Sequence, residues 1–172
     1  MNSVVINNPI DVVLKEAAEY MGVEETPKLS NRGIEIDYWL KETGVGVGNP
    51  WCAAFVSMIG RQALGVGWPV INHAYVQTIV NWGKKYSYDK PERGDLFALY
   101  FPSLNRYAHI GFVSEVLPNG KFKTIEGNSN NTGSRDGFKV AENTRQVLSN
   151  TKFIRWAEAI PSPHEYPGVA MR

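Results

Sequence analysis

The 172-residue sequence contains a single cysteine, Cys52, and this scarcity excludes two kinds of site. One thiol cannot form an intramolecular disulfide, and it cannot supply a metal site built on two or more thiolates. A chain of this length buries roughly 68–70% of its unfolded surface, so it does not need such a cross-link to hold a core. Three interpretations of Cys52 remain: a bridge to a second chain, a buried inert thiol, or a reactive thiol.

The sequence also lacks a long apolar run and an export signal. A long stretch without charge, 43–60, is interrupted by glycines and by Asn49 and Pro50, so it does not predict a transmembrane helix. The opening residues have neither the positive start nor the small-residue cleavage site of a secretory signal. We therefore expect synthesis in the cytoplasm and no insertion into a membrane.

Neither sign of charge dominates, because 18 Lys and Arg are balanced by 17 Asp and Glu, a formal net charge of +1. This balance gives no electrostatic case for a nucleic-acid partner, and we expect none. A hydrophobic content of 43% is typical of soluble globular proteins. No repeat, low-complexity tract or Gly/Ser linker divides the chain. Length and composition therefore predict one domain over residues 1–172, and we expect a monomer.

The first half of the chain has the apolar spacing of helices. Asn8 and Pro9 are typical of a helix start, Gly22 is typical of a helix end, and Asn72 is a candidate cap. Four helices are predicted, over 9–21, from about Ser30 or Asn31 to Thr43, over 51–60, and over 74–85. We expect the second helix to face the core through three side chains, Ile34, Tyr38 and Trp39.

Beyond residue 90 the pattern changes to the alternation and β-branched runs of strands. Pro118-Asn119-Gly120 is a strong hairpin signal. Helices followed by strands indicate an α+β fold with an antiparallel sheet of about five strands. The predicted strands cover 95–101, 109–117, 121–126, 138–141 and 152–156.

The predicted third helix, which is apolar nearly all round, begins beside Cys52. The free N–H groups and the positive dipole at a helix start favour a thiolate over a thiol. A thiolate nucleophile needs a base, and the base needs an orienting group. His109 lies at the start of a predicted strand, and the next strand carries Glu126 and Asn128 to within reach of its ring.

Four motifs occur in one order along the chain: NPWCAAFVSMIG, RGDLFALYF, AHIGFVSEV and TIEGNSN. Together they resemble the CHAP family, the cysteine, histidine-dependent amidohydrolases/peptidases among the papain-like thiol hydrolases that cut peptidoglycan. The resemblance covers about residues 10–156 and leaves 157–172 as a tail. It implies a papain-like domain in which N-terminal helices pack on a C-terminal antiparallel sheet.

The resemblance assigns roles residue by residue. It implies that Cys52 is the nucleophile, that His109 is the general base, and that Glu126 orients the imidazole. Asn128 matches a polar residue that completes the site, either by orienting His109 or by donating to the oxyanion. The backbone N–H of Cys52 is the expected fixed oxyanion donor. We expect a bell-shaped pH profile with His109 neutral and Cys52 ionised or ionisable.

Three further residues are candidates for substrate binding. Trp51 could form a wall of the substrate groove, although core packing is an equal alternative. The loop 103–107, with Arg106 and Tyr107, could form a lip beside the site, although a solvated loop is the simpler interpretation. Asp95, in an Arg-Gly-Asp sequence, is expected to be structural, because its side chain can hydrogen-bond locally at the start of a strand.

No metal or cofactor is expected. The sequence has no HExxH or CxxC motif, and the loop 44–50 ahead of the cysteine has no carboxylate for calcium. His73 and His164 are expected to be structural or surface residues.

The sequence therefore predicts a peptidoglycan hydrolase that cleaves either the muramoyl–L-alanine amide or a stem or cross-bridge peptide. It would act on the wall after release or delivery by another factor, as a phage lysin or an antibacterial effector, and its candidate partners are a delivery protein or an immunity protein. A wall-binding or phage structural module on a degenerate hydrolase fold is the alternative from another class. An acyl- or peptidyl-transferase that uses the same thiol is a third.

Overall fold

The computed structural model of the protein describes residues 8–130 and 137–161. The helices within these residues are α1 (Pro9–Glu19), α2 (Ile34–Glu42), α3 (Cys52–Leu64) and α4 (Val76–Trp82). Short 3-10 turns cover Gly65–Gly67, Gly83–Tyr86, Pro102–Leu104 and Trp156–Ala159. The strands are β1 (Ser87–Tyr88), β2 (Leu96–Phe101), β3 (Arg106–Leu117), β4 (Lys121–Ser129), β5 (Lys139–Gln146) and β6 (Thr151–Ile154).

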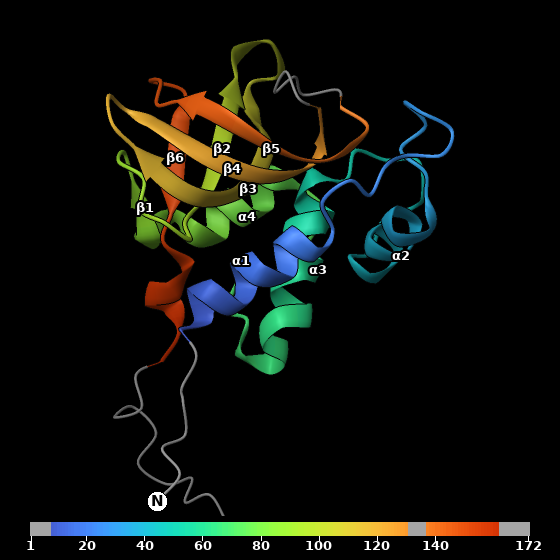
Figure 1. The fold of residues 1–172 in the computed structure, drawn as a ribbon, viewed down its shortest axis with the longest axis horizontal. Helices are drawn as coiled ribbons and strands as arrows, with labels where there is room; N and C mark the ends of the chain where they lie inside the picture. Colours follow the sequence, from blue (N-terminus) through green and yellow to red (C-terminus); the bar gives the residue numbers. More distant parts are fainter. Residues whose placement is uncertain (1–7, 131–136, 162–172) are drawn as a thin grey trace, which may run out of the picture.

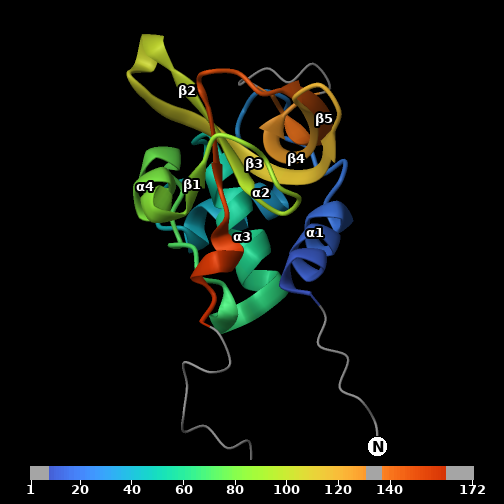
Figure 2. The same ribbon diagram turned by 90° about the vertical axis from the view of Figure 1, so that its left-hand side faces the viewer.

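The strands form one antiparallel sheet in the order β1-β6-β2-β3-β4-β5. Figure 1 shows the helices gathered below this sheet, and Figure 2 shows α3 running away from it through the middle of the helical layer. The fold is therefore α+β with helices packed on an antiparallel sheet, as the sequence predicts. The sheet has one strand more than expected, because the two-residue β1 carries no sequence signal.

The third helix forms the centre of the core. Every residue from Cys52 to Gly60 is buried, which agrees with the prediction of a helix that is apolar all round. Gly60 allows Trp68 to pack against the helix, since a Cβ there would lie 2.0 Å from the indole. Trp68 in turn contacts Trp156, with 4.6 Å between the ring centroids. The position of Cys52 is thus fixed by a rigid, fully packed helix.

Two helix predictions need correction. In α2 the core residues are Ile36, Trp39 and Leu40, whereas Ile34 is 89% exposed and Tyr38 is 50% exposed. The predicted inward face was therefore wrong except at Trp39. Both sets have helical spacing, and the register was misjudged because the helix begins at residue 34, after a Gly33 N-cap, and not at residue 30 or 31.

The fourth helix is shorter than predicted. Its N-cap is Tyr75, and the Asn72 side chain donates to the Glu42 carbonyl oxygen instead of capping the helix. The first helix begins as predicted, with the Asn8 side chain accepting from the Ile10 N–H at 2.9 Å. Across residues 8–130 and 137–161, every helix is too short or too polar to span a bilayer.

Candidate active site

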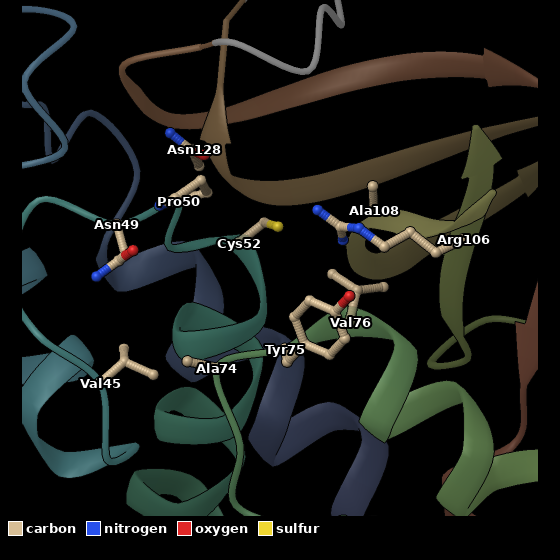
Figure 3. A pocket seen from close by; sticks show the side chains of 10 residues that line it. All are labelled: Val45, Asn49, Pro50, Cys52, Ala74, Tyr75, Val76, Arg106, Ala108 and Asn128. Atoms are coloured by element: carbon tan, nitrogen blue, oxygen red, sulfur yellow. The ribbon is translucent and has the colours of Figure 1, made fainter. Parts of the chain in front are cut away.

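Cys52 opens onto a pocket between the helical layer and the sheet. It is the first residue of α3, is 4% exposed, and is a free thiol. The cavity beside it has a volume of about 250 Å³. Figure 3 shows the residues that line the pocket: Val45, Asn49, Pro50, Cys52, Ala74, Tyr75, Val76, Arg106, Ala108 and Asn128.

The helix start at Cys52 is open toward this pocket. Trp51 is the N-cap residue and makes no side-chain capping bond. The first N–H groups of a helix have no partners within the helix, so this end offers donors and a positive potential. The loop 44–50 leads into it, and Gly44 and Gly48 adopt positive φ angles of 83° and 82° that let the chain turn there.

His109 approaches the site from β3. Leu99 pairs with His109 and Tyr100 pairs with Tyr107, so Ala108 is an extra residue in the β3 ladder. A bulge of this kind re-aims the side chains next to it, and bulges recur beside active sites. The His109 side chain is 1% exposed. It is therefore held by the sheet in a dry environment.

The two ring nitrogens of His109 have different surroundings. Nε2 donates to Glu126 Oε2 at 2.7 Å, whereas the buried Nδ1 has no hydrogen-bond partner among the described residues. Burial lowers the pKa of His109, but the Cys52 thiol and the Glu126 carboxylate outweigh burial and raise this pKa to about 9. This direction favours a charged imidazole at neutral pH, whereas the sequence predicts a neutral His109.

Glu126 is fully buried and accepts from four side chains. Besides His109, the Thr124 hydroxyl donates to Oε1 at 2.5 Å and the Ser129 hydroxyl donates to Oε2 at 3.0 Å. Arg145 binds both oxygens, through Nε at 2.6 Å and Nη2 at 2.7 Å. Burial raises the pKa of Glu126, but the bonds from Arg145 and His109 hold it well below its usual range. The carboxylate is thus a fixed anion behind the imidazole.

Two glycines let these groups come together. A Cβ at Gly111 would lie 2.9 Å from the Ile125 carbonyl oxygen, and one at Gly127 would lie 2.6 Å from Phe55 Cβ. The first glycine therefore allows close pairing of β3 and β4, and the second allows β4 to pack on α3. The glycines in the His-Ile-Gly and Glu-Gly motifs thus have a steric reason.

Asn128 lies in the pocket but does not reach His109. It sits at a bulge of β4 with a φ of 53°. Its amide nitrogen donates to Glu25 and Asn31, both at 3.2 Å, and to the Gly137 carbonyl oxygen at 3.0 Å. These bonds occupy the amide N–H groups that would donate to an oxyanion, and neither ring nitrogen of His109 bonds to Asn128 among the described residues.

The three expected substrate-binding residues have different positions. Trp51 is fully buried, and its ring lies 5.8 Å from that of Trp39, so it is a core residue and not a groove wall. Arg106 lines the pocket. Tyr107 is not in the lining and instead packs on Tyr100 at 5.4 Å. Both Arg106 and Tyr107 belong to β3, so the predicted loop 103–107 ends two residues early.

Sequence reasoning missed Arg145 and Glu25. The strand prediction stopped at residue 141, whereas β5 continues to Gln146 and carries Arg145 to Glu126. Glu25 is 2% exposed and accepts from Trp51 Nε1 at 2.9 Å and from the Asn31 N–H at 3.0 Å. Glu25 thereby ties the residue before Cys52 to Asn128. An acidic residue outside a regular element gave no signal of this position.

The remaining candidates are structural where they are described. Asp95 is 2% exposed, accepts from the Glu92 N–H at 2.8 Å and contacts Arg155. His73 Nδ1 accepts from the Tyr75 N–H at 3.0 Å. His164 lies outside the described residues. Among those that are described, no three His, Cys, Asp or Glu side chains converge on one point.

In this α+β domain the cysteine comes from a helix, and the histidine and the glutamate come from the sheet. Residues 44–128 match the family model of the CHAP domain. This segment therefore matches the CHAP family, the family that the motifs predict. The matched segment contains Cys52, His109, Glu126 and Asn128.

Among the solved structures that match this chain are two of Ly7917. The crystal structure of Ly7917 has a TM-score of 0.46 and 17% identity, with 84% of this chain and 61% of that one covered. The crystal structure of Ly7917 with the hydrolyzing product of MDP gives a TM-score of 0.47 and 17% identity, covering 84% and 62%. The chain thus spans about three fifths of the length of these structures. No curated protein matches it.

Proposed function

We propose that the protein is a peptidoglycan hydrolase that cleaves a cell-wall amide through a Cys52–His109–Glu126 thiol mechanism. The observation that carries the proposal is the alignment of three groups across the layers. The thiol lies at a helix start on the pocket, it is close enough to the imidazole to raise the pKa of His109, and the buried carboxylate holds the far ring nitrogen at 2.7 Å. The CHAP match supports the choice of cell-wall peptide as substrate.

The proposed reaction begins with attack by Cys52 Sγ on the amide carbonyl carbon. A C–S bond forms, and the carbonyl oxygen becomes an oxyanion that can accept hydrogen bonds from the N–H groups at the start of α3. His109 Nδ1 then gives its proton to the nitrogen of the leaving amine, and the C–N bond breaks. In the second half, Nδ1 takes a proton from water, hydroxide attacks the thioester carbon, and the thiolate leaves.

The electrostatics of the site suit this sequence of steps. Because the pKa of His109 is raised to about 9, an imidazolium stands beside the thiol at neutral pH. The imidazolium would provide the proton that the leaving amine needs, while the thiol beside it provides the nucleophilic sulfur. Glu126 keeps the ring oriented through Nε2 and leaves Nδ1 for the chemistry.

A non-catalytic wall-binding or phage structural module remains the competing proposal. A binder does not need a thiol, an imidazole and a buried carboxylate at one pocket. Substitution of any of these three groups would leave its binding function intact. A transferase would form the same acyl-enzyme but would pass the acyl group to an amine. The proposed enzyme acts outside the cytoplasm after release or delivery, as a lysin or an effector, and needs no metal.

The experiment that decides is digestion of purified cell walls by the native protein and by Cys52→Ala, with the released ends identified by mass spectrometry. We expect turbidity loss with the native protein and none with the variant. New free amino termini of the stem with matching lactyl ends would define an amidase, and cut stems would define an endopeptidase. New amide bonds to an added amine would define a transferase.

Two inhibitors provide the control for mechanism. Iodoacetamide should abolish the activity by alkylating Cys52, and EDTA should leave it unchanged. Activity that persists in Cys52→Ala would reject the thiol mechanism, and loss of activity in EDTA would reject the metal-free reaction. Binding to walls without new ends would favour the binder. Circular dichroism of Cys52→Ala checks that the variant is folded.

A further inference from the structure

The pocket in front of Cys52 has a one-sided charge. Of the ten residues that line it, Arg106 is the basic one, and none is an aspartate or a glutamate. The carboxylate of Glu126 does not offset this charge at the pocket, because it is fully buried and bound at both oxygens by Arg145. The site is therefore complementary to an anionic group.

Arg106 is held in place but leaves most of its donors unused. Its guanidinium lies 4.9 Å from the centre of the Tyr75 ring, a stacking contact that fixes the plane of the group. Its one hydrogen bond runs from Nη1 to the Tyr107 carbonyl oxygen at 3.4 Å. Among the described residues, no carboxylate lies within ion-pair distance of it. A guanidinium has five N–H donors, so most of the fork is free.

The guanidinium points across the pocket toward the nucleophile. Figure 3 shows it facing the Cys52 sulfur from the opposite wall, with Tyr75 below it. Arg106 comes from the start of β3, and the bulge at Ala108 separates it from His109. A substrate whose carbonyl carbon lies at the sulfur would therefore bring its neighbouring groups to Arg106.

We propose that Arg106 and Tyr75 form a subsite that binds a free carboxylate of the substrate next to the scissile amide. A planar carboxylate matches the free fork of the guanidinium through two parallel hydrogen bonds, whereas a carboxamide offers one acceptor and no charge. The inference rests on the proposed function and narrows its substrate class. The enzyme acts on stem peptides whose carboxyl group near the cut is free, and discriminates against stems in which that group is amidated.

The test uses two synthetic muramoyl stem peptides that differ in one group, a carboxylate or a carboxamide on the residue beside the scissile bond. We expect native protein to favour the carboxylate by roughly ten- to hundredfold in kcat/KM, the range of a charge-assisted bidentate contact. Arg106→Gln should reduce that ratio to about one, mainly through KM for the carboxylate peptide. Arg106→Lys should keep part of the preference, because it keeps the charge and loses the fork.

Arg93→Gln is the matched control. Arg93 pairs with Asp11 at 2.7 Å on the surface and does not line the pocket, so its variant should keep the native ratio. Equal cleavage of both peptides by the native protein would overturn the proposal. A fall in kcat of Arg106→Gln that is the same for both peptides would also overturn it, because it would place Arg106 at the oxyanion or in the fold.

A binding measurement separates this proposal from the proposed function. Calorimetry with Cys52→Ala and the same two peptides requires no turnover. Preference for the carboxylate in binding, lost in Cys52→Ala/Arg106→Gln, would support the subsite even if the native protein cleaves neither peptide. Equal affinity for both peptides would overturn the subsite whether or not the native protein hydrolyses walls.

Discussion

Arg145 determines the electrostatic character of the buried His109–Glu126 pair. Its side chain is 14% exposed and binds both oxygens of Glu126, and its guanidinium lies 5.3 Å from the centre of the Phe97 ring. A buried carboxylate with a single imidazole partner would be costly, and a bidentate guanidinium offsets that cost. Arg145 therefore acts on the reaction through Glu126 as a positioning residue.

Replacement of Arg145 should weaken catalysis and change its pH dependence. We expect Arg145→Gln to lower kcat by roughly 10- to 100-fold, as for groups that orient a metal-bound histidine. Arg145→Lys should recover part of the loss because it restores the charge. The measurement is kcat over pH 5 to 10 for the native protein and both variants. A loss of stability alone would reduce the amount of active protein and leave the profile unmoved.

The direction in which the pH profile of kcat should move in Arg145→Gln follows from the charges on His109, Glu126 and Arg145. The native enzyme should lose activity as the pH rises through about 9, where His109 loses the proton that the leaving amine needs. Glu126 stays ionised far below neutral pH, so its titration does not limit activity there. Removing the guanidinium raises the pKa of Glu126 and leaves its charge to act undivided on His109. The alkaline limb should therefore move upward in Arg145→Gln, and a limb that stays in place would contradict this role.

The contact between α3 and β4 joins the two halves of the site. Cys52 comes from the helix, Glu126 comes from the strand, and Gly127 is where the strand touches the helix. A Cβ at Gly127 would lie 2.6 Å from Phe55 Cβ and 2.8 Å from the Trp51 ring. Neither group can move easily, because both are fully buried. The spacing between the two halves of the site thus depends on the absence of a Cβ at Gly127.

Gly127→Ala should destabilise the fold by about 1–3 kcal/mol, the usual cost of overpacking a core. Urea unfolding followed by fluorescence would measure it as a lower midpoint with an unchanged slope. Gly67→Ala is the control, since a Cβ there meets only Leu64 Cβ at 4.0 Å, and it should change stability by less than about 0.5 kcal/mol. Equal effects of both substitutions would contradict the packing argument.

Local sequence patterns predicted the helices, strands and turns of this fold better than they predicted the long-range contacts of individual residues. The α3 helix was predictable because it is apolar all round, and the Asn119-Gly120 turn because both residues adopt positive φ, at 60° and 70°. The second helix was assigned the wrong face because Glu25 organises the turn before it through the Asn31 N–H, a contact absent from local spacing. The expected contact of His109 and Glu126 followed from pairing adjacent strands.

Residues that act through distant contacts could not be predicted in this way. Arg145 lies in a polar stretch of β5 whose strand character comes from its pairing with β4 and not from its own side chains. Asn128 was placed at the pocket correctly, but its bonds go to Glu25 and the Gly137 carbonyl oxygen. Trp51 beside the nucleophile resembled a groove residue, and its indole N–H instead satisfies the Glu25 carboxylate.

At the scale of the whole described domain, the site lies at the boundary of two layers. The helical layer contributes the thiol and the sheet contributes the imidazole and the carboxylate (Figures 1 and 2). One continuous core joins the layers and includes residues of α1, α3 and β2 together with Trp156. Trp156 donates from Nε1 to the Gly94 carbonyl oxygen at 2.7 Å. Opening the layers would therefore expose the core and separate the reacting groups together.

Activity and global structure should therefore be lost in one transition. In a urea titration, residual hydrolysis and tryptophan fluorescence should give the same midpoint, because four of the five tryptophans, Trp39, Trp51, Trp68 and Trp156, are buried in that core. Hydrolysis is assayed at the urea concentration in which each protein sample was equilibrated. The solubility of the substrate in urea is tested separately. A midpoint for activity below that for fluorescence would show that the pocket opens before the core.

The order of the site residues along the chain has a consequence for synthesis. The ribosome makes Cys52 first, His109 and Glu126 much later, and Arg145 last. A growing chain that has Cys52 but not the sheet holds an ordinary thiol without an imidazole. Chemical competence arrives only when β5 has paired with β4. In the proposed mechanism, incomplete copies of the chain would therefore lack the assembled site, and completion of the fold would activate the thiol.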